Sequence, residues 1–235
     1  MFNKVALKIF TQGLMSRLVK LPDDEAFKLL EKYSIPHPPH AIVKSPEEAG
    51  LAAEKLGFPV VIKVVSPDIS HKSDVGGVVL GLNNTYEVVK AAREMLERVE
   101  TRAPTARITG IMVQKMARPG VEVIIGGLRD PIFNITLMFG LGGVFTEILH
   151  DVSFRVWPIT EREALEMITE IQSNQLLRGY RTTPPVDVKS LARIIVRLGE
   201  IFEDHLALHS ADLNPVIAYS DGALVVDARF IVKED

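Results

Sequence analysis

A lysine stands in the middle of the apolar run PVVIKVV, residues 59–65. An ammonium group among branched aliphatic side chains loses hydration that only an anion or a polar partner can replace. A lysine on a rigid strand is a point charge suited to a phosphate group. Lys63 is therefore a candidate phosphate ligand. The alternative is an edge strand whose lysine reaches solvent.

The segment after Lys63 contains the sequence DVGG, residues 74–77. Adjacent glycines allow backbone N–H groups to converge on phosphate oxygens, because no side chain stands in the way. Asp74, Gly76 and Gly77 are therefore assigned with Lys63 to the phosphate site. The alternative is an ordinary turn or bulge at the start of the next strand.

Three oxygen-bearing side chains lie near the end of the chain in two strand-like segments. Asp212 and Asn214 are two residues apart, so their side chains point to the same face of a strand. Asp227 follows the apolar run ALVV on a segment expected to run antiparallel to the first. Two carboxylates and a carboxamide suit Mg²⁺. The alternative is a hairpin with polar residues on its solvent face.

A third pattern is the strand, turn and return strand of MVQKMARPGVEVIIG, residues 112–126. The backbone at Gln114, Lys115 and Met116 is a candidate for hydrogen bonding to a purine. Glu122, on the return strand, would accept a hydrogen bond from a ribose hydroxyl. Because this pattern is common in sheets, the assignment is a hypothesis.

These residues need strands and helices to position them. Hydrophobic periodicity and turn residues predict strands at 40–43, 59–65, 77–82, 108–116, 121–128, 133–139, 153–159, 207–219 and 223–232. Helices are expected within 21–35, 45–59, 83–100, 160–172 and 187–204. Ser45, Asn84 and Thr160 are N-caps, each with a glutamate three residues on, and Gly57 ends the second helix. The fold class is α+β, divided into residues 21–107 and 108–235, the second part mostly antiparallel.

Composition excludes several classes of protein. The 235 residues are 47% hydrophobic and 24% charged, with a net charge of −3 and no block of basic residues, so no nucleic-acid partner is expected. Without cysteine there are no disulfides and no thiolate sites. Residues 1–20 have an amphipathic helical pattern with too much charge for a signal peptide or membrane span, which predicts a docking helix of a cytoplasmic protein.

In their order along the chain, these features resemble the signature of an ATP-grasp domain. More closely, the segments FPVVIKVVSPDISHKSDVGGVVLGL, GLGGVFTEILHDVSFRVWPI, LLRGYRTTPPVD and SADLNPV resemble the β subunit of ADP-forming acetate–CoA ligase, an acyl-CoA synthetase. The resemblance extends from about residue 15 to the end. It implies two α+β subdomains that hold ADP or ATP between them, with Mg²⁺.

The resemblance also implies roles for three further residues. His71, in SHKSDVGG, matches the histidine proposed to carry a phosphoryl group transiently in this family. Neutral imidazole is a good phosphoryl acceptor, although without the resemblance a surface-loop histidine is the simpler interpretation. Arg155 would neutralise charge on the transferring phosphoryl group, and Glu147 would orient His71 or an incoming phosphohistidine.

The implied reaction is acyl-CoA + ADP + phosphate ⇌ acid + CoA + ATP. The chain has no G-x-G-x-x-G fingerprint, so a CoA-binding α subunit is expected as partner, in an α₂β₂ assembly according to the resemblance. The sequence does not specify the acyl group. Two alternatives are a stand-alone ATP-grasp ligase that joins a carboxylate to an amine, and a non-catalytic nucleotide-sensing module.

Overall fold

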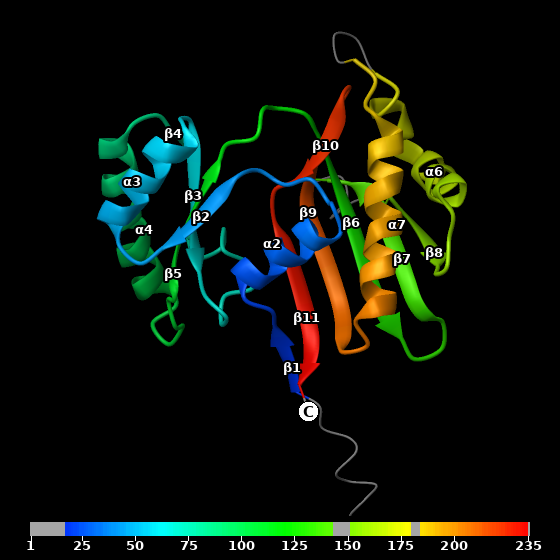
Figure 1. Ribbon diagram of the computed structural model, residues 1–235, viewed down its shortest axis with the longest axis horizontal. Helices are drawn as coiled ribbons and strands as arrows, with labels where there is room; N and C mark the ends of the chain where they lie inside the picture. Colours follow the sequence, from blue (N-terminus) through cyan, green and yellow to red (C-terminus); the bar gives the residue numbers. More distant parts are fainter. Residues whose placement is uncertain (1–16, 143–150, 180–183, 235) are drawn as a thin grey trace, which may run out of the picture.

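The computed structural model describes residues 17–142, 151–179 and 184–234. Two sheets lie next to each other, one with four strands and one with seven (Figure 1). Glu147, predicted from the sequence as a site residue, lies outside the described residues. Within the described residues, no helix is long and apolar enough to cross a membrane.

The smaller sheet has the order β2-β5-β3-β4, with every neighbouring pair antiparallel. Its strands are β2 (His40–Val43), β3 (Val60–Val65), β4 (Val78–Leu82) and β5 (Gly110–Lys115). Helices α3 (Pro46–Leu56) and α4 (Thr85–Arg102) cover one face and bury alanine, valine and methionine side chains against it. The other face, which carries Lys63, turns toward the larger sheet.

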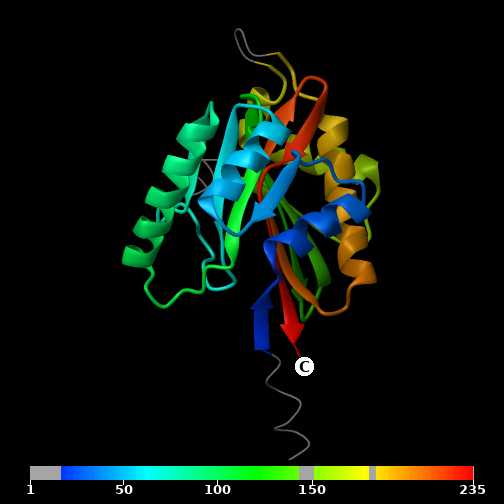
Figure 2. The same cartoon turned by 60° about the vertical axis from the view of Figure 1, so that its left-hand side comes forward.

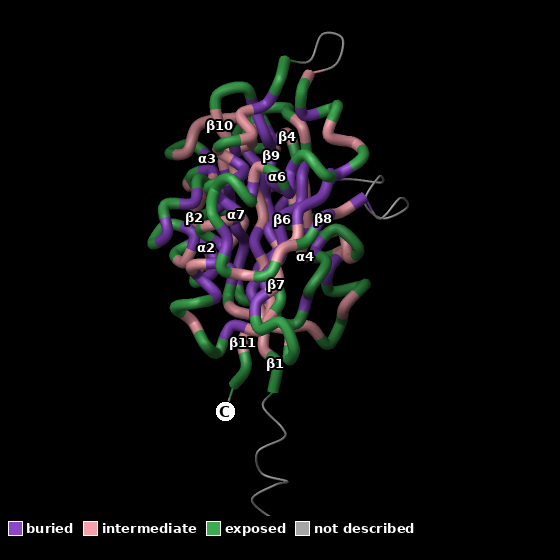
Figure 3. The backbone as a smooth tube through the Cα atoms, turned by 90° about the vertical axis from the view of Figure 1, so that its right-hand side faces the viewer, coloured by how far each residue is buried: buried purple, intermediate pink, exposed green. Residues whose placement is uncertain are grey.

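The larger sheet has the order β1-β11-β9-β6-β7-β8, and β10 pairs with the far end of β9. Its strands are β1 (Arg17–Lys20), β6 (Val121–Asp130), β7 (Asn134–Leu141), β8 (Val152–Val156), β9 (Leu208–Tyr219), β10 (Gly222–Val225) and β11 (Ala228–Glu234). Helices α2 (Asp23–Lys32), α6 (Glu161–Glu170) and α7 (Val188–Asp204) bury one face, and a short 3₁₀ helix, η1 (Gln172–Leu176), follows α6. Figure 3 shows the buried backbone concentrated along these strands.

Helix ends follow local sequence chemistry. The Ser45 hydroxyl accepts a hydrogen bond from the N–H of Glu48 at 3.1 Å. In the same way, the side-chain oxygen Oδ1 of Asn84 accepts one from the N–H of Glu87 at 2.9 Å. Thr160 with Glu163 forms the full reciprocal capping box. At α3 the reciprocal capping box is incomplete, because the Glu48 carboxylate accepts a hydrogen bond from the N–H of Lys44 and not from that of Ser45.

The N-terminal prediction is wrong at its end. Residues 17–20, expected to be helical, form β1 and pair antiparallel with β11, from Arg17 opposite Glu234 to Lys20 opposite Ile231 (Figure 2). The pairing satisfies the outer edge of β11, which would otherwise expose its backbone hydrogen-bonding groups. Residues 1–16 of the predicted docking helix lie outside the described residues.

Two segments lie on the other side of the predicted division at residues 107 and 108. β5 pairs with β2 and β3, so it completes the smaller sheet, whereas α2 packs with the larger one. The sequence signals locate individual elements, but sheet membership is decided by long-range pairing.

The last strand is also divided. Segment 223–232, expected to be continuous, breaks into β10 and β11, which pair with opposite ends of β9. At the break the N–H of Val226 bonds to Pro215 and the N–H of Asn214 bonds to the carbonyl of Asp227. The break places the Asp227 side chain at the junction between the two sheets.

Candidate functional site

Lys63 and Asp227 meet where the two sheets join. The Lys63 ammonium donates to the Val226 carbonyl at 2.6 Å and to Asp227 Oδ1 at 3.2 Å. β3 lies between β5 and β4, which excludes the edge-strand interpretation of Lys63. Lys63 is 7% exposed, and the hydrogen-bond partners that its ammonium has among the described residues, Val226 and Asp227, come from the other sheet. The two sheets are therefore tied together by an ion pair.

This ion pair belongs to a larger group of charges, here called the junction cluster: Lys20, Asp23, Lys63, Lys72 and Asp227. Lys72 lies 3.2 Å from Asp23 Oδ1 and 3.4 Å from Asp227 Oδ1, and Lys20 lies 3.1 Å from the same Asp23 oxygen. Three ammonium groups thus share two carboxylates, which leaves an excess of one positive charge. A buried excess charge requires a counter-ion, so the cluster is complementary to an anion.

The pKa shifts agree with this shortage of negative charge. Burial lowers the pKa of Lys63, and the neighbouring Lys72 lowers it further against the attraction of Asp227. Burial alone would raise the pKa of Asp227, but Lys63 and Lys72 outweigh it and hold that pKa below its usual range. For Lys72, the two carboxylates outweigh burial and raise its pKa.

The cluster also fixes the segment that carries His71. Lys20 donates to the carbonyls of Ser66 and Ile69 at 3.1 Å and 3.4 Å, and Lys72 is held at its ammonium by two carboxylates. His71 is exposed between these two anchor points, so its imidazole faces solvent while its backbone is held.

His71 lies beside two residues of the larger sheet. Its Nε2 is 3.4 Å from Arg229 Nη1, and Arg229 Nη2 is 3.3 Å from Asp212 Oδ2. Arg229 and Asp212 are direct neighbours across β11 and β9. Their row lies on the sheet face opposite α7, since Ala211 and Phe230 point into the core beneath the helices. A nucleophile, a cation and a carboxylate therefore share one open surface.

The predicted metal ligands come together at the same place. Asp227 lies opposite Asn214 where β9 and β11 begin to pair, and Asp212 precedes Asn214 by two residues on β9. Burial raises the pKa of Asp212, the Asp227 charge raises it further and Arg229 opposes both. No group of three or more histidine, cysteine or acidic side chains in the described ranges could hold a metal. Two carboxylates and one carboxamide nevertheless fit a hard cation that shares its shell with phosphate oxygens and water.

The glycine pair is held differently from the sequence hypothesis. The N–H of Gly77 donates to the Lys72 carbonyl at 2.8 Å, and that of Gly76 to Ser73 at 3.0 Å. A Cβ on Gly77 would lie 2.4 Å from Val64 Cγ1, so close approach to β3 requires glycine there. Asp74 is exposed. In this structure these residues shape the segment after His71, and their contact with phosphate stays a prediction.

The residues of the predicted purine-binding strand point in opposite directions. Gln114 shares the face of Lys63, is 1% exposed, and its Nε2 has no hydrogen-bond partner within the described part of the chain. The Lys115 ammonium points away and donates to the Gly57 and Phe58 carbonyls, where it closes the end of α3. The N–H of Met116 already donates to Pro59, and Glu122 is exposed. Gln114 is thus the one of these side chains that awaits an acceptor.

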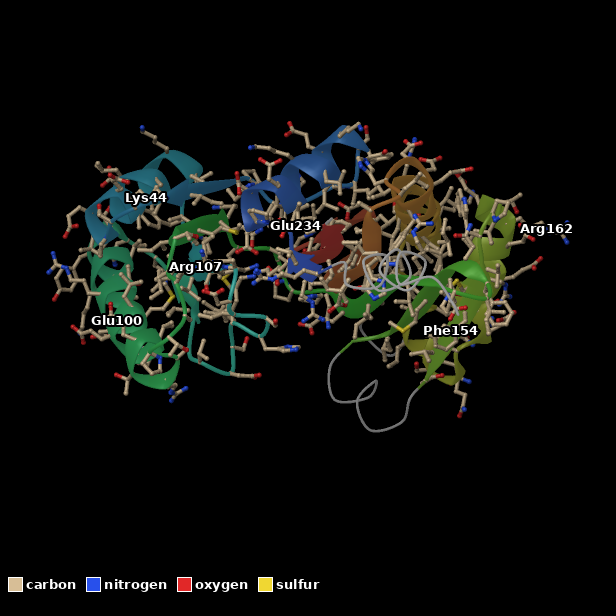
Figure 4. The ribbon with its side chains drawn as sticks, turned by 90° about the horizontal axis from the view of Figure 1, so that it is seen from below. Lys44, Glu100, Arg107, Phe154, Arg162 and Glu234 are labelled. Atoms are coloured by element: carbon tan, nitrogen blue, oxygen red, sulfur yellow. The ribbon has the colours of Figure 1, made fainter. Side chains whose placement is uncertain are left out.

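Arg155 is not brought to the junction. It lies on β8, the edge strand four positions from β11, and its guanidinium pairs with Glu170 of α6 on the helix-covered side. Figure 4 shows the adjacent Phe154 toward the end of the molecule opposite Glu100 and Lys44. Its predicted role in phosphoryl transfer therefore has no support from this geometry.

Sequence reasoning missed four residues of the site: Lys20, Asp23, Lys72 and Arg229. Asp23 has the sequence signature of an exposed acid in the first turn of a helix, yet it is 2% exposed. Lys72 has no apolar neighbours that would mark it as buried. Arg229 follows Asp227 by two residues, and alternation along a strand would have placed both on one face.

Comparison with known proteins decides the family. The ATP-grasp domain family matches residues 13–232. The chain belongs to the ATP-grasp family. Among its relatives, the β subunit of acetate–CoA ligase [ADP-forming] I of Pyrococcus furiosus is 44% identical over 212 residues, covering 90% of this chain and 91% of the relative. The β subunit of isoenzyme II from the same organism is 40% identical and covers 97% and 98%.

Other relatives are longer than this ATP-grasp chain. Acetate–CoA ligase [ADP-forming] I of Archaeoglobus fulgidus is 46% identical over 90% of this chain, but the match spans only 31% of that protein. Among solved structures, the dinucleotide-forming acetyl-coenzyme A synthetase 1 of Ca. Korarchaeum cryptofilum, with coenzyme A, Ca-AMPCP and HgCl⁺, matches with a TM-score of 0.90 and 47% identity over 97% of this chain and 98% of that one. These findings confirm the resemblance inferred from the sequence and the two-part ATP-grasp fold.

Proposed function

We propose that this chain is the nucleotide-binding β subunit of an ADP-forming acyl-CoA synthetase. It would catalyse the phosphoryl-transfer half of acyl-CoA + ADP + phosphate ⇌ acid + CoA + ATP. The observation that carries this proposal is the junction cluster, where Lys63 of one sheet meets Asp227 of the other and positive charge is in excess. The β subunits of Pyrococcus furiosus, which this chain matches over nearly its whole length, support the assignment.

The polyphosphate of ADP or ATP supplies the anion that the cluster lacks. Lys63 and Lys72 would bind its terminal oxygens, and the contact between Lys63 and Asp227 must then loosen because the phosphates need the same space. Mg²⁺, held by Asp212, Asn214 and Asp227, would neutralise the phosphate charge and bridge its oxygens. A related solved structure from Ca. Korarchaeum cryptofilum is in complex with Mg-AMPPCP, which supports this cation and this nucleotide class. Gln114 would donate to the nucleotide from the same face as Lys63.

His71 passes the phosphoryl group to the nucleotide. Its neutral imidazole attacks phosphorus, the bond to the incoming donor breaks, and a phosphohistidine forms. A β-phosphate oxygen of ADP then attacks the same phosphorus, and the electron pair of the breaking P–N bond returns to the imidazole. The exposed position of His71, between the anchored carbonyls of Ser66 and Ile69 and the paired side chain of Lys72, suits a group that must meet two partners.

The donor would be a CoA-binding α subunit. Relatives described as β subunits imply such a partner, and a related Ca. Korarchaeum cryptofilum structure has a phosphohistidine segment that points toward its nucleotide site. An α₂β₂ assembly in the cytoplasm completes the proposal. The acyl group would be selected by the α subunit, so the substrate class here is a nucleoside diphosphate and a phosphorylated histidine.

The test combines this chain with an α subunit from the same genome, acyl-CoA, Mg·ADP and labelled phosphate. Formation of ATP by the mixture, and by neither chain alone, supports the proposal. His71→Asn should keep the Mg·ADP affinity within about twofold while ATP formation falls by at least about a hundredfold, since the nucleophile is lost. Conversion of ATP to ADP and phosphate by the isolated chain, dependent on a carboxylate and an amine, would instead indicate a stand-alone ligase. Nucleotide binding with no phosphoryl transfer in the complex would indicate a sensing module.

A further inference from the structure

Arg229 has no role in the proposal so far, yet its guanidinium contacts the reactive imidazole. Its two terminal nitrogens divide between His71 Nε2 at 3.4 Å and Asp212 Oδ2 at 3.3 Å. Its side chain is 29% exposed and that of Asp212 is 32% exposed, so the pair is partly shielded but open on the side of His71. A guanidinium in this position has further N–H donors that can bind an anion.

The chemistry of this contact fixes the protonation of the ring. Arginine has five N–H donors and no acceptor. Any hydrogen bond from Arg229 to His71 therefore requires Nε2 to be the unprotonated nitrogen, and the ring proton must lie on Nδ1. The Nε2 electron pair of His71 then points toward Arg229 and the larger sheet, and it becomes the nucleophile when the guanidinium turns from the ring to the phosphoryl oxygens.

A phosphoryl group on Nε2 would lie against Arg229. Planar guanidinium groups bind phosphate oxygens through two parallel N–H bonds, and these charge-assisted bonds are among the stronger hydrogen bonds in proteins. Asp212 competes for the same donors, because its carboxylate accepts from Nη2 when His71 is not phosphorylated. Arg229 would thus pair with Asp212 before His71 is phosphorylated and with the phosphoryl group afterwards.

We infer that His71 is phosphorylated on Nε2, that Arg229 binds the phosphoryl group there, and that Asp212 holds Arg229 in place until the group arrives. This inference rests on the proposed function in naming His71 as the phosphoryl carrier. In the step itself, the Nε2 electron pair forms the N–P bond, the bond from phosphorus to the donor breaks with its electrons leaving on the donor, and the proton on Nδ1 stays.

A small phosphoryl donor tests this without partner or nucleotide. The full chain is incubated with phosphoramidate and EDTA, which removes any bound metal. Nε2 of His71 attacks phosphorus, the P–N bond of phosphoramidate breaks, and ammonia leaves. Peptide mapping against His71→Asn locates the label, and ³¹P NMR distinguishes the Nε2 isomer from the Nδ1 isomer. The expected result is a label on His71 in the Nε2 isomer.

Two variants with opposite expected effects separate phosphoryl binding from simple structural support. Arg229→Gln should lower the labelling rate of His71 by about tenfold or more, because a charge-assisted contact is lost, and should give a mixture of isomers. Asp212→Asn should raise the rate several-fold, because Arg229 no longer has a competing anion. Arg197→Gln is the matched control. Arg197 is paired with Glu200 at 3.0 Å on α7, across the sheet, and its variant should label as the wild type does.

The outcomes are distinct. A label on Nδ1 in the wild type, unchanged rate and isomer in Arg229→Gln, or a slower rate in Asp212→Asn would each overturn the inference. If the labelled wild type does not pass its phosphoryl group to added Mg·ADP, the proposed function fails while the assignment of Nε2 and Arg229 stands. If the group passes but the isomer is Nδ1, the function stands and this inference fails.

Discussion

The junction cluster and the surface group of His71, Arg229 and Asp212 contrast sharply although they adjoin. Asp227 and Arg229 are two residues apart and project from the same face, yet Asp227 joins buried lysines and Arg229 faces an exposed imidazole. The buried cluster is fixed by several partners for each charge. Among the described residues, the surface group is joined by two long contacts of 3.3–3.4 Å, so its members can change partners at small cost.

The difference shows how one short segment serves two purposes. The three ammonium groups of the cluster have side chains only 6–9% exposed, so their ion pairs are expensive to break, which ties the sheets together and fixes the backbone around His71. Both members of the surface pair are about 30% exposed, which leaves that pair weak and suits a group that must release one anion to bind another. The predictions below test this contrast, from the largest expected effect to the smallest.

Removing the acid of the junction cluster should have the largest effect on stability. Asp227→Asn leaves Lys63 and Lys72 facing a neutral amide, and loss of one partner from a buried ion pair costs about 3–5 kcal/mol. Urea unfolding of the chain measures the loss. Asp221→Asn, which removes an exposed pair with Arg118, is the control and should cost less than about 1 kcal/mol. Similar losses in both variants would remove the distinction between buried and surface charges.

The same comparison has a definite pH dependence. The pKa of Asp227 is lower in the folded chain than in the unfolded one, so its charge stabilises the fold above the unfolded value of about 3.9. This contribution is lost as the pH falls through the lower folded pKa. The difference in unfolding free energy between wild type and Asp227→Asn should be constant near neutral pH and shrink in acid. If this difference grew on acidification, it would contradict the stabilising role of the Asp227 charge in the junction cluster.

Much of this site was visible in the sequence, but only residue by residue. Lys63 in an apolar run and Asp227 after one both marked a buried charge, and the structure brings the two together. What the sequence could not show was pairing: Lys20 and Asp23 reach the cluster because β1 lies beside β11, a contact between opposite ends of the chain. Local periodicity has no information about such long-range register.

The differences between the expected and the observed placement of residues have the same origin. Residues 17–20 can form a helix by pattern, but the open edge of β11 makes them a strand. Arg155 lies in a segment that resembles the family's sequence, but the sheet order places it at the far edge beside Glu170. Both outcomes were decided by tertiary neighbours, which override local preference.

A smaller effect is expected at Gln114. Its buried Nε2 lacks an acceptor among the described residues, so replacing it by leucine removes an unsatisfied donor. Gln114→Leu should leave the unfolding free energy unchanged or raise it by about 1 kcal/mol, and should weaken Mg·ADP binding. Thermal unfolding with and without Mg·ADP measures both. Gln172→Leu, at an exposed position, is the control. A destabilised Gln114→Leu with unchanged nucleotide affinity would make the glutamine structural.

The central claim is that the excess positive charge of the junction cluster binds nucleotide phosphates. The most direct measurement is calorimetric titration of Mg·ADP into Lys63→Met, with Lys28→Met as control because Lys28 is an exposed lysine paired with Asp24 and Glu25. The account predicts an affinity at least about tenfold weaker for Lys63→Met, since a charged phosphate contact is lost, and wild-type affinity for the control. Equal affinity for wild type and Lys63→Met would contradict it.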